Sequence, residues 1–192
     1  MAHTDDNAII AKVLAGETVA FAQLVNRYKD MVFSVARRVT TNTSDAEEVA
    51  QDAFLKAFQA LPGFKKESKF STWLYRIATN TAISATRKRK ITMASLDETM
   101  IENYSEDEVK ENLNYLSGEE QSHHVQEAMK QLHSQDVMLV NMFYSDELGI
   151  EGISEVTGLS QANVKVRLHR IRKKLYVLLE GMMHNQRIAT GH

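Results

Sequence analysis

The sequence predicts an all-α protein. Apolar residues recur at spacings of three and four, as on one face of a helix, and almost nowhere keep the alternation of two that is typical of strands. Proline occurs once and glycine eight times in 192 residues, so long stretches contain no residue that would interrupt a helix. The length allows one domain or two small ones, and the organisation along the chain favours two.

The first half of the chain predicts five helices with recognisable starts or ends. The first stops at Gly16, and the fourth begins with the capping box Ser44-Asp45-Ala46-Glu47, in which a hydroxyl and a carboxylate satisfy free backbone N–H groups. Pro62 and Gly63 end that helix, and the loop 64–70 leads into the fifth. The expected helices span about 7–15, 18–28, 30–39, 44–61 and 72–90.

A stretch of weak periodicity and strong negative charge separates the two halves. Residues 1–92 carry 14 basic and 9 acidic side chains, residues 93–120 carry 1 and 9, and residues 121–192 carry 8 and 7. The net charge of -2 therefore excludes only a protein whose whole surface is basic for binding nucleic acid. We expect an N-terminal domain at 1–92, a flexible acidic linker at 93–118, a C-terminal domain at 119–183 and a frayed tail at 184–192.

The C-terminal domain is expected to contain a helix-turn-helix. A second capping box, Ser117-Gly118-Glu119-Glu120, opens it. Gly158 suits the left-handed position that closes a short helix, and Ser160 can cap the next one. Two helices joined by such a turn place the second in the DNA major groove, although an ordinary corner between helices looks the same in sequence. The expected helices span about 119–132, 135–144, 150–157 and 161–181.

The helix after this turn is predicted to bind DNA. Val164, Leu168, Ile171 and Leu175 form one apolar stripe, while six Lys or Arg and no acid lie between residues 163 and 174. Such a basic face can neutralise the phosphates of DNA. The alternative is an ordinary charged helix face that is exposed to solvent and binds no nucleic acid. The opposite side carries Ala162, Lys165, Val166, His169, Arg170 and Lys173. Of these, Lys165 and Arg170 can donate to guanine edges, and Val166 can meet a thymine methyl.

A second candidate nucleic-acid surface lies on the helix that begins near Thr72. Trp73, Arg76, Asn80, Ser84 and Arg87 share one ridge, and an indole with amide and guanidinium groups suits the stacking and binding of unpaired bases. The basic loop 64–70 beside it is suited to form one side of a pocket for an extruded base. A buried tryptophan with a solvated polar ridge is the alternative.

The helix from residue 45 to Leu61 has a different character. Its expected inward positions are Val49, Ala53, Ala57 and Leu61. The other side combines Leu55 with carboxylates, which suggests a protein partner that presents arginines, with a solvated face as the alternative.

Three ordered stretches of the chain carry a resemblance to a known family. They are Asp45–Phe54 (DAEEVAQDAF), Phe70–Asn80 (FSTWLYRIATN) and Val164–Leu175 (VKVRLHRIRKKL). In that order they resemble the extracytoplasmic-function (ECF, group IV) bacterial RNA polymerase sigma factors, over about residues 8–180. The resemblance implies a sigma region 2 domain and a sigma region 4 domain joined by a linker, and no enzymatic activity.

The resemblance also implies partners and site residues. The partners would be core RNA polymerase, through its β′ clamp helices and β flap, promoter DNA, and an anti-sigma factor. Polymerase contacts would come from Asp45, Glu48, Gln51, Asp52 and Leu55. The minus-10 element would meet Phe64, Lys66, Phe70, Trp73, Arg76, Asn80 and Arg87. The minus-35 element would meet Gln161, Lys165, Val166, Arg167, His169, Arg170 and Lys173.

Other function classes are less well supported. A stand-alone helix-turn-helix regulator explains the C-terminal half but not the ridge from Trp73 to Arg87. An enzyme would need His123, His124 and His133 as metal ligands, and adjacent histidines on a helix point about 100° apart. The absence of cysteine excludes disulfides and thiolate chemistry. With neither a signal peptide nor a membrane span of ~20 residues, we expect a soluble cytoplasmic protein without membrane insertion and without a cofactor.

Overall fold

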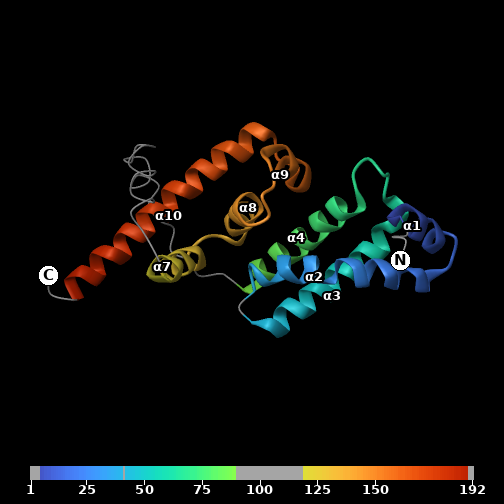
Figure 1. The fold of residues 1–192 in the computed structure, drawn as a ribbon, viewed down its shortest axis with the longest axis horizontal. Coiled ribbons are helices and arrows are strands. Elements are labelled where there is room, and N and C mark those ends of the chain that lie inside the picture. The colour runs from blue at the N-terminus through green and yellow to red at the C-terminus, as the bar shows by residue number, and fades with distance from the viewer. Residues whose placement is uncertain (1–4, 41, 90–118, 190–192) are drawn as a thin grey trace. The chain divides into compact units, whose positions relative to one another are not determined.

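The computed structural model describes residues 5–40, 42–89 and 119–189, and it describes side chains up to residue 86 and from 123 to 182. Within these residues every regular element is a helix, so the expected all-α class is confirmed (Figure 1). The chain divides into two compact units, the first built on α1 to α4 and the second on α7, α8, α10 and the start of α9. The expected acidic linker at 93–118 lies outside the described residues.

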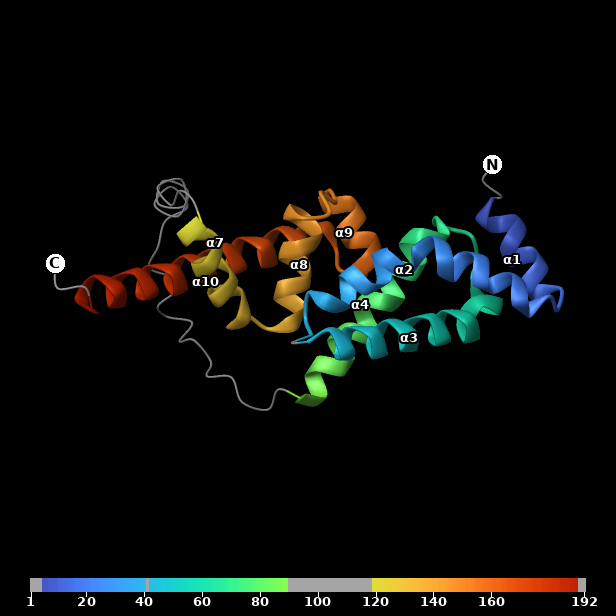
Figure 2. The ribbon, with the colours of Figure 1, turned by 60° about the horizontal axis from the view of Figure 1, so that its bottom comes forward.

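The described residues of the N-terminal unit form four α-helices and two short 3₁₀ helices. Their bounds are α1 Asp6–Leu14, η1 Thr18–Ala20, α2 Phe21–Arg37, α3 Thr43–Ala60, η2 Leu61–Gly63 and α4 Phe70–Arg89. Helices α2, α3 and α4 pack against one another, as the turned view in Figure 2 shows. Their interior is closed by fully buried side chains of all three, among them Leu24, Val35, Ala53, Ala57 and Leu74.

Helix α2 is continuous where the sequence predicted two helices, and that expectation was wrong. The expected break at Asp30 does not exist, because Val32, Val35 and Ala36 continue the buried stripe begun by Phe21 and Leu24. No glycine or proline lies in the helix, so nothing opposes this packing.

Helix α3 is capped by a different residue from the one predicted. Asn42 has extended backbone, and its side chain accepts a hydrogen bond of 2.8 Å from the backbone N–H of Asp45. Ser44 is therefore already inside the helix, and the predicted capping box is wrong at this end. At the other end the stop at Pro62 is confirmed, with a 3₁₀ turn replacing the α-helix.

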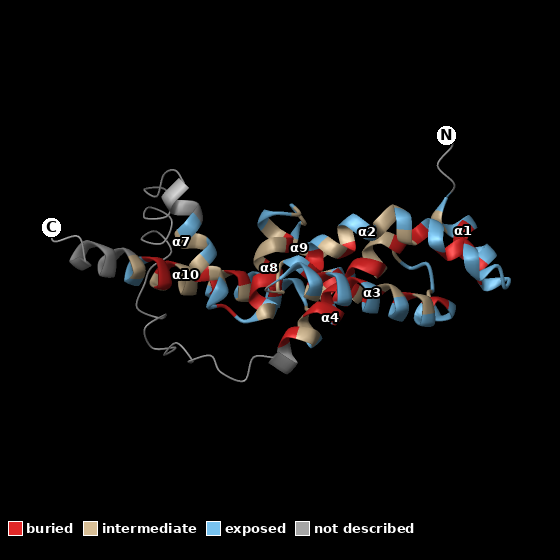
Figure 3. Cartoon of the chain, turned by 90° about the horizontal axis from the view of Figure 1, so that it is seen from below, coloured by how far each residue is buried: buried red, intermediate tan, exposed pale blue. Residues whose placement is uncertain are grey.

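In the described residues from 119 to 189, four helices follow one another in the expected order. They are α7 Glu119–Lys130, α8 Ser134–Tyr144, α9 Ile150–Thr157 and α10 Gln161–Ala189. Both α7 and α8 pack against α10. Buried stretches of these helices are red in the cartoon of Figure 3. The buried apolar residues include Ala128, Leu132, Met138, Leu139, Met142, Val164, Leu168, Ile171 and Leu179.

Helix α10 is longer than predicted. It continues through Gly181 to Ala189, whereas the sequence suggested an end at Gly181 and a frayed tail. Gly181 does not have a positive φ, so it fits the helix at the modest cost of about 1 kcal/mol relative to alanine. The serine of the second predicted capping box, Ser117, lies outside the described residues.

Candidate nucleic-acid interfaces

The turn between α9 and α10 has the geometry of a helix-turn-helix. Gly158 has φ +74°, a left-handed conformation that a side chain would strain. The Ser160 hydroxyl accepts from the backbone N–H of Asn163 at 3.2 Å and so caps α10. On the α9 side, the Ser154 hydroxyl donates to the carbonyl of Leu159 at 2.6 Å. The predicted roles of Gly158 and Ser160 are confirmed, and the hydrogen bond of Ser154 connects α9 to the end of the turn.

The first turns of α10 present two different faces. Val164, Leu168 and Ile171 are at most 2% exposed, which confirms the inward stripe at these three positions, whereas its fourth member, Leu175, is only partly buried. Val166 lies on the other side and keeps 51% of its surface exposed, although it is apolar. That side also carries Gln161, Lys165 and Arg170, which are exposed, and His169 and Lys173, which are partly buried. The helix therefore offers a contiguous basic surface with one apolar contact point.

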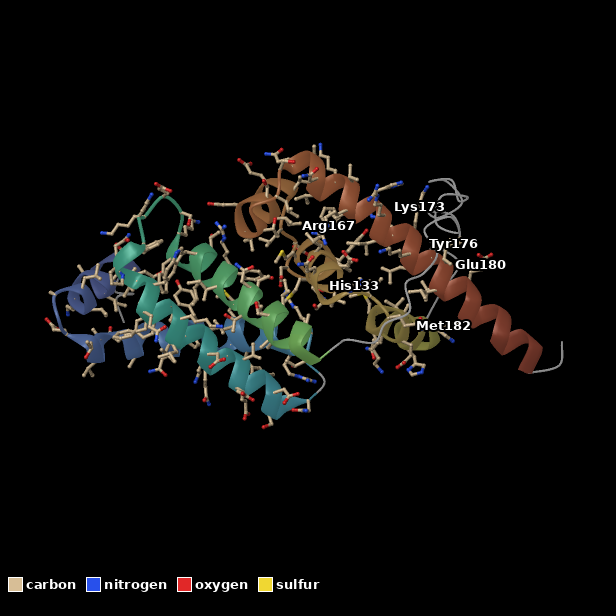
Figure 4. The ribbon with its side chains drawn as sticks, turned by 180° about the vertical axis from the view of Figure 1, so that it is seen from behind. His133, Arg167, Lys173, Tyr176, Glu180 and Met182 are labelled. Carbon is tan, nitrogen blue, oxygen red and sulfur yellow. The ribbon has the colours of Figure 1, made fainter. Side chains whose placement is uncertain are left out.

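Arg167 is placed differently from the other predicted DNA contacts. Its Nη2 atom lies 3.1 Å from Oδ1 of Asp136 and 3.3 Å from Oε1 of Gln135. Lys174 Nζ lies 3.8 Å from the other oxygen of Asp136, which is only 8% exposed as a residue. Figure 4 shows Arg167 where α10 passes α8, with Lys173 and Tyr176 further along the helix. Arg167 thus joins α10 to α8.

Arg172 also contacts α8. Fewer of the basic residues of α10 therefore remain on its outward face. The Arg172 Nε donates to the Tyr144 hydroxyl at 2.7 Å, and its guanidinium lies 5.6 Å from the Phe143 ring centroid and 5.8 Å from that of Tyr144. Three of the six basic residues predicted to neutralise phosphate therefore contact α8. The other three are Lys165, Arg170 and Lys173.

In the N-terminal unit, three aromatic rings gather at the start of α4. The centroid of Trp73 lies 5.1 Å from that of Phe64 and 5.6 Å from that of Phe70, while Phe64 and Phe70 are 5.8 Å apart. Lys66 has φ 61° in the loop between them. The structure thus places the loop beside the helix as predicted, and it adds ring contacts among Phe64, Phe70 and Trp73 that the sequence did not predict. Phe70 is 4% exposed, so it is a buried member of this cluster.

The predicted polar ridge of α4 is exposed at its described polar positions. Arg76, Asn80 and Ser84 are exposed, while Leu74 and Ala78 are buried beneath them. Arg87 lies in α4, but its side chain is outside the described residues. Trp73 itself is partly buried, which leaves part of the indole accessible beside Arg76.

Helix α3 has the two faces that its sequence predicted. Val49, Ala53, Ala57 and Leu61 are buried, while Leu55 keeps 55% of its surface exposed. Glu48, Gln51 and Asp52 are also exposed, and Asp45 accepts a 3.0 Å hydrogen bond from the amide of Asn42. Leu55 is therefore an exposed apolar residue on an otherwise acidic and polar face.

A polar cluster behind the aromatic rings was not predicted. The Asp6 carboxylate on α1 pairs with Arg27 and accepts a hydrogen bond from the Tyr28 hydroxyl, both on α2. Burial raises the pKa of Tyr28 to about 12, and the hydrogen bond and charge of Asp6 add to this shift. The Tyr28 ring lies 5.7 Å from Phe70. The sequence shows an acidic residue at the start of α1, but this residue alone does not reveal which side chain it contacts.

The histidines considered as metal ligands do not form a site. The rings of His123 and His124 lie 6.1 Å apart. Across the described ranges, no three His, Asp or Glu side chains come together in a way that could hold a metal ion. In the same parts of the chain, no helix combines the length and the apolar character needed to cross a membrane.

Comparison with known proteins gives matches to both parts of the chain. Residues 24–91 match Sigma-70 region 2, and residues 123–175 match Sigma-70, region 4. The chain is 34% identical over 173 residues to the ECF RNA polymerase sigma factor SigW of Bacillus subtilis, covering 86% of this chain and 92% of that protein.

Two solved structures share the fold. CnrH in complex with the cytosolic domain of CnrY is 24% identical, with a TM-score of 0.57 over 92% of this chain and 97% of CnrH. The sigma factor RpoE of Bartonella quintana, in complex with the anti-sigma factor NepR, is 20% identical, with a TM-score of 0.56 over 83% of this chain and 96% of that one.

Proposed function

The chain belongs to the extracytoplasmic-function RNA polymerase sigma factors, and from that premise we propose how its two units divide promoter recognition. As a member of this family it is a non-enzymatic subunit that directs transcription initiation, so phosphodiester chemistry stays with the polymerase. We place a region 2 domain at 1–92 and a region 4 domain at 119–183, joined by the acidic segment 93–118.

The C-terminal unit reads the minus-35 element. The observation that carries this assignment is the two-sided α10, whose buried stripe fixes an exposed face of Gln161, Lys165, Val166 and Arg170 after a capped glycine turn. A recognition helix enters the major groove with its first turns, where lysine and arginine donate to guanine and an apolar side chain meets the thymine methyl. His169 and Lys173 flank this face, and Arg167 holds α10 in place.

The N-terminal unit captures unpaired bases of the minus-10 element. Trp73 rests on Phe64 and Phe70, so a partly accessible indole is held rigidly enough to stack on a base. Arg76 and Asn80 follow it along the exposed ridge, and Lys66 and Arg87 supply positive charge at the two ends. Stacking needs no fixed base sequence, whereas the Asn80 amide can read a base edge.

Helix α3 docks on core polymerase. Glu48, Gln51 and Asp52 surround the exposed Leu55, and this combination suits a helical partner that presents arginines around an apolar contact. We assign the β′ clamp helices to this face, with Asp45 at its start, and the β flap to the C-terminal unit. Both assignments place the chain in the cytoplasm with the polymerase.

Control by an anti-sigma factor is the regulatory part of this proposal. A protein of the same fold, RpoE of Bartonella quintana, is seen with the anti-sigma factor NepR. An inhibitor of this kind would need to cover a polymerase-binding surface, and the exposed Leu55 on α3 offers an apolar anchor for it.

Run-off transcription from a randomised promoter pool tests the proposed function. Core polymerase with the full chain should enrich templates that share two sequence blocks at a fixed spacing, and core polymerase alone should not. A matched binding selection uses the chain without core. Selection of duplex sites by the free chain, with no promoter-dependent transcripts in its presence, would instead identify a stand-alone helix-turn-helix regulator.

A further inference from the structure

The aromatic cluster of Phe64, Phe70 and Trp73 is connected to the first helix of the chain. We propose that Asp6 and Tyr28 are positioning residues for base capture, which hold Phe70 from behind and thereby set the position of Trp73. This proposal rests on the proposed function of Trp73, and it extends that site to α1, which no predicted contact includes.

Tyr28 is held at two points. Its hydroxyl donates to the Asp6 carboxylate on α1, and its ring lies 5.7 Å from Phe70 at an interplanar angle of 55°. Asp6 is held in turn by its ion pair with Arg27, one residue before Tyr28. A tyrosine fixed at both its hydroxyl and its ring has little freedom to rotate, so it forms a firm support for Phe70.

Phe70 connects this support to the surface. It is 4% exposed, lies in the first turn of α4, and contacts Phe64 as well as Trp73. Three residues later, the backbone N–H of Trp73 donates to the carbonyl of Lys69 at 3.1 Å, which fixes the main chain beneath the indole. Because packed interiors transmit small displacements, a shift of Tyr28 moves Phe70 and the two rings that rest on it.

Two conservative variants separate positioning from simple stability. Tyr28→Phe keeps the ring that contacts Phe70 and removes only the hydroxyl that reaches Asp6. Asp6→Asn keeps the size of the acceptor and removes its charge. Tyr75→Phe is the matched control, since Tyr75 is an 8% exposed tyrosine of α4 whose hydroxyl accepts from Arg38 on the loop after α2 at 2.9 Å.

Trp73 is the single tryptophan of the chain, so its fluorescence reports on the cluster directly. In the free full-length protein, at a temperature where circular dichroism shows each variant folded, Tyr28→Phe and Asp6→Asn should shift the emission maximum and increase quenching by acrylamide. Tyr75→Phe should leave both unchanged. Emission and quenching that stay at wild-type values in Tyr28→Phe and Asp6→Asn would overturn the proposal.

The functional readout uses holoenzyme assembled from core polymerase and the full chain. Tyr28→Phe should weaken binding of a single-stranded minus-10 oligonucleotide by about three- to tenfold, the equivalent of one lost hydrogen bond. Asp6→Asn should weaken it in the same direction, because it removes the ion pair with Arg27 and the charge of the acceptor. Binding of an upstream minus-35 duplex should stay within about twofold of wild type, which corresponds to a loss below ~0.4 kcal/mol. Equal losses in Tyr28→Phe and Tyr75→Phe would show a general stability effect and overturn the positioning role.

Trp73→Ala in the same assay separates the two levels of the inference. If Trp73→Ala weakens oligonucleotide binding while Tyr28→Phe and Asp6→Asn do not, Trp73 captures bases and the positioning role of Asp6 and Tyr28 is wrong. If Trp73→Ala also has no effect, the proposed function of Trp73 fails, and the inference built on it fails for that reason.

Discussion

Oδ1 of Asp136, in the first turn of α8, lies 3.1 Å from Nη2 of Arg167 on α10, so two residues that are 31 positions apart in the sequence join the two helices. Lys174 approaches the same carboxylate at 3.8 Å. Asp136 is thus a nearly buried acid that two cations of the recognition helix share. The orientation of α10 on its unit depends on this residue as well as on the apolar stripe.

Asp136→Ala should destabilise the C-terminal unit by about 2 kcal/mol, the range for a hydrogen bond to a charged group that is partly shielded from water. Urea unfolding followed by circular dichroism measures this loss. Gln135→Ala is the matched comparison, because it removes only an exposed 3.3 Å contact to the same arginine and should cost about 0.5 kcal/mol or less. Equal losses in the two variants would contradict the central role given to Asp136.

The cap of α3 gives a second prediction, in which the structure and the sequence pattern disagree. Asn42→Ala should cost about 1 kcal/mol, because it removes the side-chain acceptor for the N–H of Asp45. Ser44→Ala should cost little, since Ser44 lies inside the helix. Free energies of unfolding in urea decide between them, and a larger loss in Ser44→Ala would restore the predicted capping box.

Stability at high pH should depend on Tyr28. Its pKa is raised to about 12 in the folded protein from an ordinary value of 10, so the folded state keeps a proton that the unfolded state loses. The resulting stabilisation is complete below pH 10 and is lost as the pH rises toward about 12. Urea unfolding of wild type and Tyr28→Phe between these limits measures it, since groups common to both cancel in the difference. A difference that does not change with pH would show that Tyr28 has an ordinary pKa.

Variants at the two DNA surfaces should affect different steps of initiation. Trp73→Ala should slow strand opening by roughly 10-fold or more, since stacking on one base is worth ~1–3 kcal/mol, and should leave upstream duplex binding nearly unchanged. Lys165→Ala or Arg170→Ala should weaken duplex binding by a similar factor and reduce its salt dependence. Gel shifts and permanganate footprinting with holoenzyme distinguish the two steps.

Lys130→Ala serves as the control for this pair, because Lys130 pairs with Glu127 on α7 and is not on the recognition helix. It should change neither step. If Trp73→Ala and Lys165→Ala reduce opening and duplex binding to the same extent, the proposed division between the two units is wrong.

Local signals in the sequence were enough to predict the helix-turn-helix and its faces. The positive φ of Gly158 and the cap at Ser160 depend on neighbouring residues alone, and a period of 3.6 residues separates Val164 and Leu168 from Val166. The same rule separated Leu55 from the buried side of α3. These features need no knowledge of how the helices pack.

The features that were missed depend on packing between distant residues. Arg167 was assigned to DNA because it lies in a basic run, and only the position of α8 reveals Asp136 beside it. A charged residue followed by the apolar run from Val137 to Val140 was the available hint that Asp136 would be partly buried. Likewise, Asp6 meets Tyr28 only after α1 packs on α2.

The continuity of α10 has a mechanical consequence. The helix carries its candidate base contacts in the first turns and the core residues Tyr176 and Leu179 about 20 Å further on, at ~1.5 Å per residue. Because the helix is unbroken, a rotation at one end also displaces the other end. A tilt of about five degrees at the end held by α7 displaces the reading end by about 2 Å, comparable to the difference between a made and a broken hydrogen bond. Between Lys165 and the part of the helix that packs on α7, the contacts of Arg167, Arg172 and Lys174 with α8 oppose such a tilt.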